Sequence, residues 1–117
     1  MPRSAIAYLS DIIEACHAIE DVLSGVDLGT YQRTRAIRSA VEREFITIGE
    51  AISVLGRVAP DVVEGISHAR MIVRFRNVLT HDYAAVDDET VLALAPSDLP
   101  EPKRECEVLL ERTGEAE

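Results

Sequence analysis

The chain has 117 residues, 47% hydrophobic and 28% charged, which is enough for one compact domain and too few for two, so we expect a single domain over residues 1–117. Its formal net charge of −9 excludes a protein that binds nucleic acid over its whole surface, because that binding needs clustered Lys and Arg. The two cysteines form no C-x-x-C pair, so neither a disulfide framework nor a zinc site is indicated.

The N-terminal residues contain no apolar run long enough for a signal peptide or a membrane span, since Asp11 and Glu14 interrupt it. We therefore expect a cytoplasmic protein in a reducing compartment, with no membrane contact and no DNA partner. Any contact with RNA must be local, because acidic residues outnumber basic ones 21 to 12.

The first predicted helix runs from Ser4 to Leu23, where apolar residues recur at helical spacing. Gly25 is placed to end it, and residues 25–29 are expected to form a loop. A second, longer helix is predicted from about Thr30 to Val58, closed by Pro60.

Gly49 lies inside this second predicted helix and costs helix propensity there. One explanation is that another helix approaches closely at this point. The alternative is a glycine that the helix simply tolerates.

A short piece from Asp61 to Ile66 leads to a third predicted helix over about 67–80. Asp87 is a good N-cap for a fourth helix. Three prolines are expected to break that helix before a last one over about 103–112; they are Pro96, Pro100 and Pro102. No useful strand-like alternation appears, so we predict an all-α protein, an up-down helical bundle.

The third predicted helix has an apolar arc with a polar row on each flank, at about 100° per residue. The arc comprises Met71, Ile72, Phe75, Val78 and Leu79. One polar row comprises Arg70, Arg74, Asn77 and His81, and the other comprises Arg76, Thr80 and Tyr83. The first row is a cationic strip that is able to hold a phosphate.

Arg76 and His81 are five residues apart, or about 140° on a continuous helix, so one copy does not easily direct both at one atom. Two such helices packed across a two-fold axis would bring both residue types into one cleft. The alternative is a solvated helix face with weak ion pairs and a histidine that caps the helix. His17 and His68 have no partner at ligand spacing and are expected to be structural or surface residues.

Residues 76–83, R-N-V-L-T-H-D-Y, match the pattern R-N-x-x-x-H-x-Y, which resembles the signature of the HepT-like toxins of the HEPN superfamily. The stretches I-G-E-A at 48–51 and V-D-D-E-T-V at 86–91 also resemble segments of that family. Ala69 and Arg74 stand where many relatives carry a tryptophan and a glycine. The resemblance covers nearly the whole chain.

The resemblance implies a HEPN-type helical bundle that forms a homodimer, with a composite cleft between the two signature helices. It implies a metal-independent endoribonuclease that needs no cofactor, with Arg76 and His81 as catalytic residues and Asn77 in support. In this interpretation the ribose 2′-hydroxyl attacks the adjacent phosphate, His81 acts as general base or acid, and Arg76 stabilises the developing charge. Arg70 and Arg74 are candidate contacts to RNA phosphates.

The resemblance also implies a partner, a minimal nucleotidyltransferase (MNT) antitoxin of a type II toxin–antitoxin pair, which neutralises the toxin by AMPylation of the signature tyrosine, here Tyr83. A second hypothesis is a non-catalytic helical binding module that serves as partner and modification substrate of a nucleotidyltransferase. The third is a structural bundle in which the motif is only a polar flank.

Overall fold

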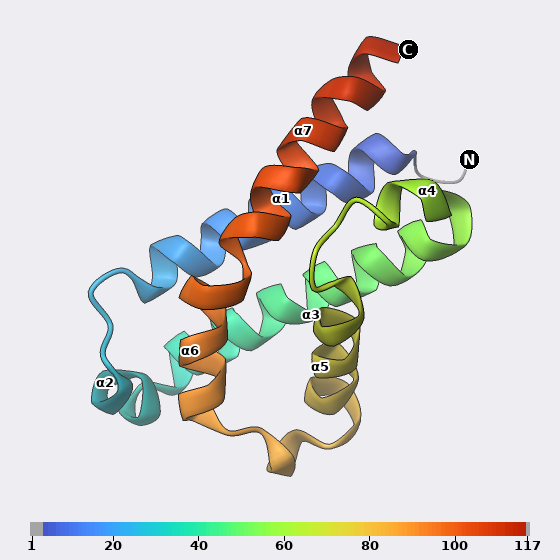
Figure 1. Cartoon of the computed structure of the whole chain (residues 1–117). Coiled ribbons are helices and arrows are strands. Elements are labelled where there is room, and N and C mark those ends of the chain that lie inside the picture. Colours follow the sequence, from blue (N-terminus) through green and yellow to red (C-terminus); the bar gives the residue numbers. More distant parts are fainter. Residues whose placement is uncertain (1–3, 117) are drawn as a thin grey trace.

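The computed structural model describes residues 4–116, except for the side chains of Tyr83 and of residues 114–116. Its elements, labelled in Figure 1, are α1 (Ala5–Leu23), α2 (Leu28–Arg33), α3 (Arg35–Val58), α4 (Pro60–Val63), α5 (Ala69–His81), the 3₁₀ turn η1 (Tyr83–Ala85), α6 (Asp88–Asp98) and α7 (Pro100–Ala116). No strand occurs over residues 4–116, and the prediction of an all-α bundle is confirmed.

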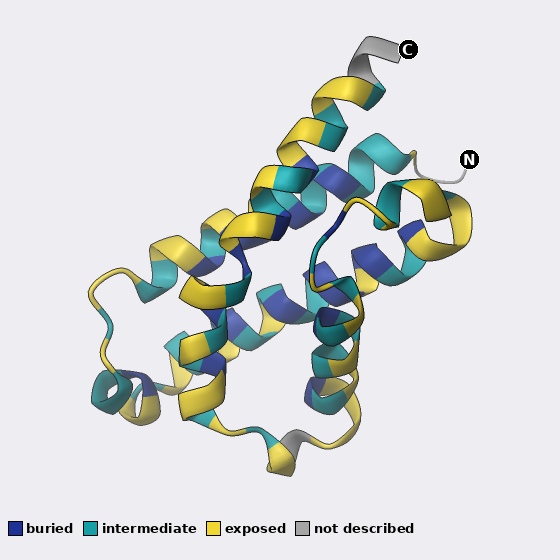
Figure 2. Cartoon of the chain, viewed as in Figure 1, coloured by how far each residue is buried: buried dark blue, intermediate teal, exposed yellow. Residues whose placement is uncertain are grey.

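The long helix α3 lies at the centre of the bundle. It packs against α1 and α5, while α1 packs also against α7, and Figure 1 shows α1 antiparallel to both α3 and α7. The inward sides of these helices are buried (Figure 2). The largest side chains that are fully buried within α1 and α3 are Leu9, Ile12, Ile19, Val41, Phe45, Ile48 and Leu55. Burial of this apolar surface is the main force that holds the bundle together.

The predicted second helix is divided in two, because Thr34 has an extended backbone (φ −114°, ψ 91°) between α2 and α3. The first of these two helices, α2, begins at Leu28, two residues before the predicted start at Thr30. The carboxylate of Asp27 accepts a hydrogen bond from the backbone N–H of Thr30 at 2.8 Å and so caps α2. Arg38 donates to the carbonyl groups of Tyr31 and Gln32, which satisfies acceptors that the end of α2 leaves open.

The predicted break at Pro96 is wrong, since α6 continues through Pro96 to Asp98. Pro96 lies in the last turn of α6, so the hydrogen bond that it cannot donate is lost only at the end of the helix. Pro100 and Pro102 lie in the first turn of α7, where the missing N–H groups would have no helical partner in any case. The N-cap of α6 is confirmed, because the Asp87 carboxylate accepts hydrogen bonds from the N–H of Glu89 at 3.3 Å and the hydroxyl of Thr90 at 2.8 Å.

The start of α5 is fixed by the loop before it. His68 has a left-handed backbone (φ 63°), so α5 begins at Ala69, two residues later than predicted. The N–H and the hydroxyl of Ser67 both donate to the carboxylate of Glu105 on α7, each at 2.8 Å. The loop is thereby attached to α7 as well as to the helices that it connects.

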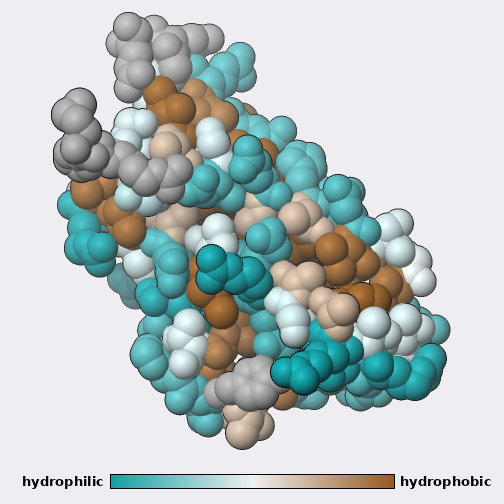
Figure 3. Space-filling view, turned by 180° about the vertical axis from the view of Figure 1, so that it is seen from behind, coloured by the Kyte–Doolittle hydropathy of each residue, from teal (hydrophilic) through white to brown (hydrophobic). Residues whose placement is uncertain are grey.

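The outer surface is mixed in character. Figure 3 shows separate hydrophobic patches interspersed with hydrophilic side chains on the face opposite to the view in Figure 1. Within the described part of the chain, no helix has the length and apolar character needed to cross a bilayer.

Candidate functional site

The contact between α3 and α5 depends on Gly49. A Cβ atom built there would lie 2.4 Å from Cβ and 2.8 Å from Cγ of Arg76, and 3.5 Å from the carbonyl oxygen of Ile72. The first two distances are too short for real atoms, so a side chain at position 49 would force the helices apart. The predicted close approach of a second helix at Gly49 is confirmed.

The apolar side of α5 completes this contact. Ile72 and Leu79 are buried, and the ring of Phe75 meets that of Phe45 edge-on, with centroids 5.1 Å apart and an interplanar angle of 86°. The orientation of α5 about its own axis is therefore fixed. The same packing fixes the backbone positions from which its polar residues project.

Arg76 is half-buried between the two helices. Its Nη2 atom donates a hydrogen bond to the hydroxyl of Ser53 on α3 at 3.0 Å, and its Nε atom is buried without a hydrogen-bond partner. Within the described residues no carboxylate forms an ion pair with it. The guanidinium is thus held by packing and by a hydroxyl, and its positive charge stays available to an anion.

His81 is the last residue of α5 and is exposed, as is Asn77 one turn earlier. Because the helix continues through His81, Arg76 and His81 are separated by about 140° around the axis and about 7.5 Å along it. One copy of the chain therefore presents Arg76 toward α3 and His81 to solvent, and does not bring the two together at one point.

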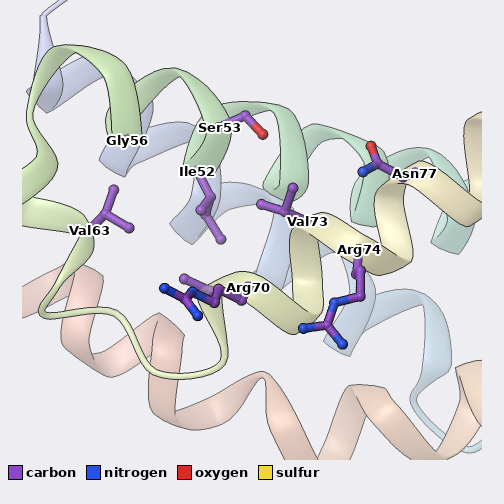
Figure 4. A pocket seen from close by; sticks show the side chains of 9 residues that line it. Ile52, Ser53, Gly56, Val63, Arg70, Val73, Arg74 and Asn77 are labelled. Atoms are coloured by element: carbon purple, nitrogen blue, oxygen red, sulfur yellow. The ribbon is translucent and has the colours of Figure 1, made fainter.

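The cationic strip predicted on α5 borders a groove of about 370 Å³ between α3, α4 and α5. The groove, here called the α3–α5 groove, is lined by Ile52, Ser53, Gly56, Val63, Ala69, Arg70, Val73, Arg74 and Asn77. Arg70 and Arg74 project from the same side of α5, one turn apart (Figure 4). The structure thus brings together three members of the strip, while His81 does not line the groove.

Tyr83 begins the η1 turn just beyond α5, and its side chain lies outside the described residues. The expectation for that side chain therefore stays a prediction. In the described part of the chain, no group of three or more His, Cys, Asp and Glu side chains could hold a metal ion. His17 is exposed and lies 3.8 Å from the Glu20 carboxylate, and His68 is an exposed loop residue, in line with the expected surface roles.

Ser53 is the functional candidate that the sequence interpretation missed. It contacts Arg76 and also lines the α3–α5 groove. A signal was present, because Ser53 follows Gly49 by four residues and so lies on the same face of α3. A close approach at Gly49 therefore also brings the partner helix near Ser53.

Comparisons with known proteins agree with this geometry. The family model described as "Ribonuclease HepT-like" matches residues 12–109. Three proteins of Methanocaldococcus jannaschii, each named "putative RNase", are similar to this chain. Two are 31% identical over 113 residues, which cover 94% of this chain and 91% or 95% of theirs. The third is 27% identical over 107 residues, covering 92% of this chain and 97% of its own. No solved structure matches the chain at a significant level.

Proposed function

Since the chain belongs to the HepT-like ribonuclease family, we propose that it is the toxin of a type II toxin–antitoxin pair, a metal-independent endoribonuclease whose active site is shared by two copies of the chain. Arg76 and His81 are its catalytic residues and Asn77 supports them. Arg70 and Arg74 contact phosphates of the RNA.

The observation that carries this proposal is the placement of Arg76. Arg76 is held half-buried against Gly49 and by the Ser53 hydroxyl, and no carboxylate among the described residues forms an ion pair with it. Burial without an ion pair is costly and is typical of residues retained for chemistry rather than for stability. A guanidinium group in such a site binds a phosphate strongly, because the phosphate supplies the negative charge that the protein does not provide.

The separation of Arg76 from His81 supports a composite site. If two α5 helices face each other across a two-fold axis, each subunit presents its exposed His81 to the other, and a phosphate between them meets residues from both. A helix end with an exposed histidine is suited to this arrangement. Within one chain the two side chains diverge.

RNA cleavage at such a site needs no metal ion. The ribose 2′-hydroxyl attacks the adjacent phosphorus while one His81 removes its proton, and the bond to the 5′-oxygen breaks as the second His81 donates a proton to that oxygen. The products are a 2′,3′-cyclic phosphate and a free 5′-hydroxyl. Arg76 stabilises the negative charge that builds up on the phosphorus-bound oxygens in the transition state.

The proposed partner is an MNT-type nucleotidyltransferase that transfers AMP to Tyr83. Tyr83 follows the end of α5 by two residues, close along the chain to His81. An added AMP carries a phosphate, so its negative charge would compete with RNA for the arginines and its bulk would obstruct the cleft. Mass spectrometry after co-expression with the partner should find AMP on the Tyr83 peptide, and an unmodified peptide from a stable complex would contradict this.

A second candidate function is a binding module that is modified by a nucleotidyltransferase and does not cleave RNA. The acidic net charge of −9 favours it, since general RNA binders are basic. One experiment separates the two functions. Unmodified protein, purified without a partner, is incubated with RNA beside the His81→Ala variant. Cleavage by the unmodified protein alone supports the ribonuclease, and equally intact RNA in both reactions supports the binding module.

A further inference from the structure

The α3–α5 groove differs in its charged residues from four other hollows of the described surface. Four other hollows among the described residues each contain a carboxylate: Glu20, Glu42 with Asp88, Glu105, and Glu64. The hollow with Glu64 adjoins the α3–α5 groove and is also lined by Arg70 and Arg74. The α3–α5 groove contains no carboxylate, and it carries two arginines. In a chain with 21 acidic residues and 12 basic ones, this is a local site for an anion.

The two arginines are free to bind an anion. Neither Arg70 nor Arg74 forms an ion pair within the described residues, and both are exposed. They are four residues apart on α5 and so start from the same face of the helix, and Figure 4 shows both guanidinium groups extending away from it. Two guanidinium groups in this arrangement suit the oxygens of one phosphate group or of two successive ones.

The floor of the groove is apolar. It is formed by Ile52 from α3, Val63 from α4, and Ala69 and Val73 from α5, and Gly56 leaves the surface open because it has no side chain. A volume of about 370 Å³ lies within the range of about 300–1,000 Å³ that is typical of small-molecule sites. An apolar surface beside two cations suits a ligand with a flat, weakly polar part and a phosphate, which is the chemistry of a nucleotide.

We propose that the α3–α5 groove is a subsite that binds one nucleotide of the RNA substrate, with its phosphate on Arg70 and Arg74 and its base on the apolar floor. This inference rests on the proposed ribonuclease function, because it takes RNA as the ligand. Asn77 at the end of the groove supplies an amide that hydrogen-bonds a base edge or a ribose hydroxyl.

Ser53 connects this subsite to the proposed catalytic residue. Its side chain lines the groove and accepts the hydrogen bond from Nη2 of Arg76 at 3.0 Å. The nucleotide in the groove therefore lies next to the guanidinium that contacts the reacting phosphate. The subsite therefore binds a nucleotide next to the phosphodiester bond that is cleaved. By holding that nucleotide, it determines which bond of the RNA lies at the catalytic residues.

Gly56 allows a test of the floor that does not disturb the fold. A Cβ atom at Gly56 meets nothing within 4 Å, so the Gly56→Phe variant places a ring over the groove without a clash at Cβ. Val58→Phe is its control, since Val58 is 56% exposed near the same end of α3 and does not line the groove. Arg74→Ala tests the cation, and Arg43→Ala on the exposed side of α3 is its charge-matched control.

The probe is a single-stranded RNA hexamer with 2′-O-methyl riboses, which binds but lacks the 2′-hydroxyl needed for cleavage, and the readout is fluorescence anisotropy. We expect Gly56→Phe and Arg74→Ala to weaken binding about tenfold, as for loss of one well-placed contact. Arg74→Ala should also reduce the slope of log K against log [salt] by about one, while Gly56→Phe leaves the slope unchanged. Both control variants should bind within about twofold of the unchanged protein.

Two results would overturn the subsite. In one, Gly56→Phe and Arg74→Ala bind the hexamer as tightly as their controls do. In the other, Gly56→Phe lowers the solution mass to that of a monomer, which would make the groove an interface between copies. The proposed function fails separately, if the unchanged protein binds the hexamer but leaves ordinary RNA intact.

Discussion

Arg76 of α5 lies directly over Gly49 of α3, at a distance that leaves no room for even one methyl group on residue 49. The glycine therefore determines how closely the two helices approach and how deeply Arg76 is seated. The hydroxyl of Ser53, one turn further along α3, then accepts a hydrogen bond from Arg76. Stability and the proposed chemistry depend on the same contact.

Gly49→Ala should destabilise the protein by about 1–3 kcal/mol, because the new methyl group overlaps Cβ of Arg76, whose position is fixed by the backbone of α5. Gly56→Ala on the same helix is the matched control. Its methyl group meets nothing within 4 Å, so it should stabilise the protein by about 0.5–1 kcal/mol. Urea unfolding measures both variants, and equal effects would contradict the packing argument.

Ser53→Ala should lower kcat/KM for RNA cleavage by about two- to tenfold, since it removes one hydrogen bond that positions the guanidinium of Arg76. Ser53→Thr retains the hydroxyl and should restore most of the activity. Cleavage rates at several RNA concentrations give the measurement. A loss that threonine does not restore would show that Ser53 acts through packing alone.

Glu105→Ala should lower the free energy of unfolding by about 1–3 kcal/mol, because it leaves the half-buried N–H and hydroxyl of Ser67 without their acceptor. Hydrogen exchange at the Ser67 amide should accelerate more than exchange in α3. Glu107→Ala, exposed on the same helix, is the control and should change stability by less than about 0.5 kcal/mol. Unchanged exchange at Ser67 would mean that the loop is held by other contacts.

Burial raises the pKa of the Cys16 and Cys106 thiols from 9.0 to about 12, with smaller contributions from nearby charges. Both thiols should therefore react slowly with iodoacetamide in the native protein at pH 8 and rapidly in urea. Fast alkylation of the native protein would contradict the burial.

The same two thiols predict a loss of stability in alkaline solution. Above about pH 9 the unfolded chain releases thiol protons that the native protein retains up to about pH 12. The native state then binds more protons than the unfolded state, so the free energy of unfolding falls as the pH rises. The slope is about 1.4 kcal/mol per pH unit for each thiol. Urea unfolding at successive pH values measures it, and a flat profile would contradict it.

The sequence was sufficient to predict the helices that have strong apolar periodicity and clear terminators. Pro60, Gly25 and Asp87 act through local sterics and hydrogen bonds, and local chemistry can be recognised in a sequence. The division at Thr34 was not predictable in this way. It depends on Arg38, which satisfies the carbonyls of Tyr31 and Gln32 only after the chain has turned.

In the candidate site, too, the features that depend on local sequence were predictable, and those that depend on the packing of separate helices were not. The residue types and the spacing in 76–83 suggested the chemistry, and Gly49 suggested a close helix contact. The hydrogen-bond acceptor of Arg76 depends on how α3 and α5 are aligned along their lengths. The sequence does not give that alignment, so Ser53 was missed. The α3–α5 groove was missed for the same reason, because its walls come from three separate helices.

The central claim is that Arg76 of one subunit acts together with His81 of the other. It is tested most directly by mixing two inactive variants, Arg76→Ala and His81→Ala, under conditions that exchange subunits. A mixed dimer then has one Arg76 and one His81, carried by different chains. If the site is composite, the mixture regains measurable RNA cleavage although neither variant cleaves alone. The mixture cleaves more slowly than the unchanged protein, because a mixed dimer has one His81 to transfer protons instead of two. If the mixture stays as inactive as its components while the unchanged protein cleaves RNA, the two residues do not act across the dimer, and the account is contradicted.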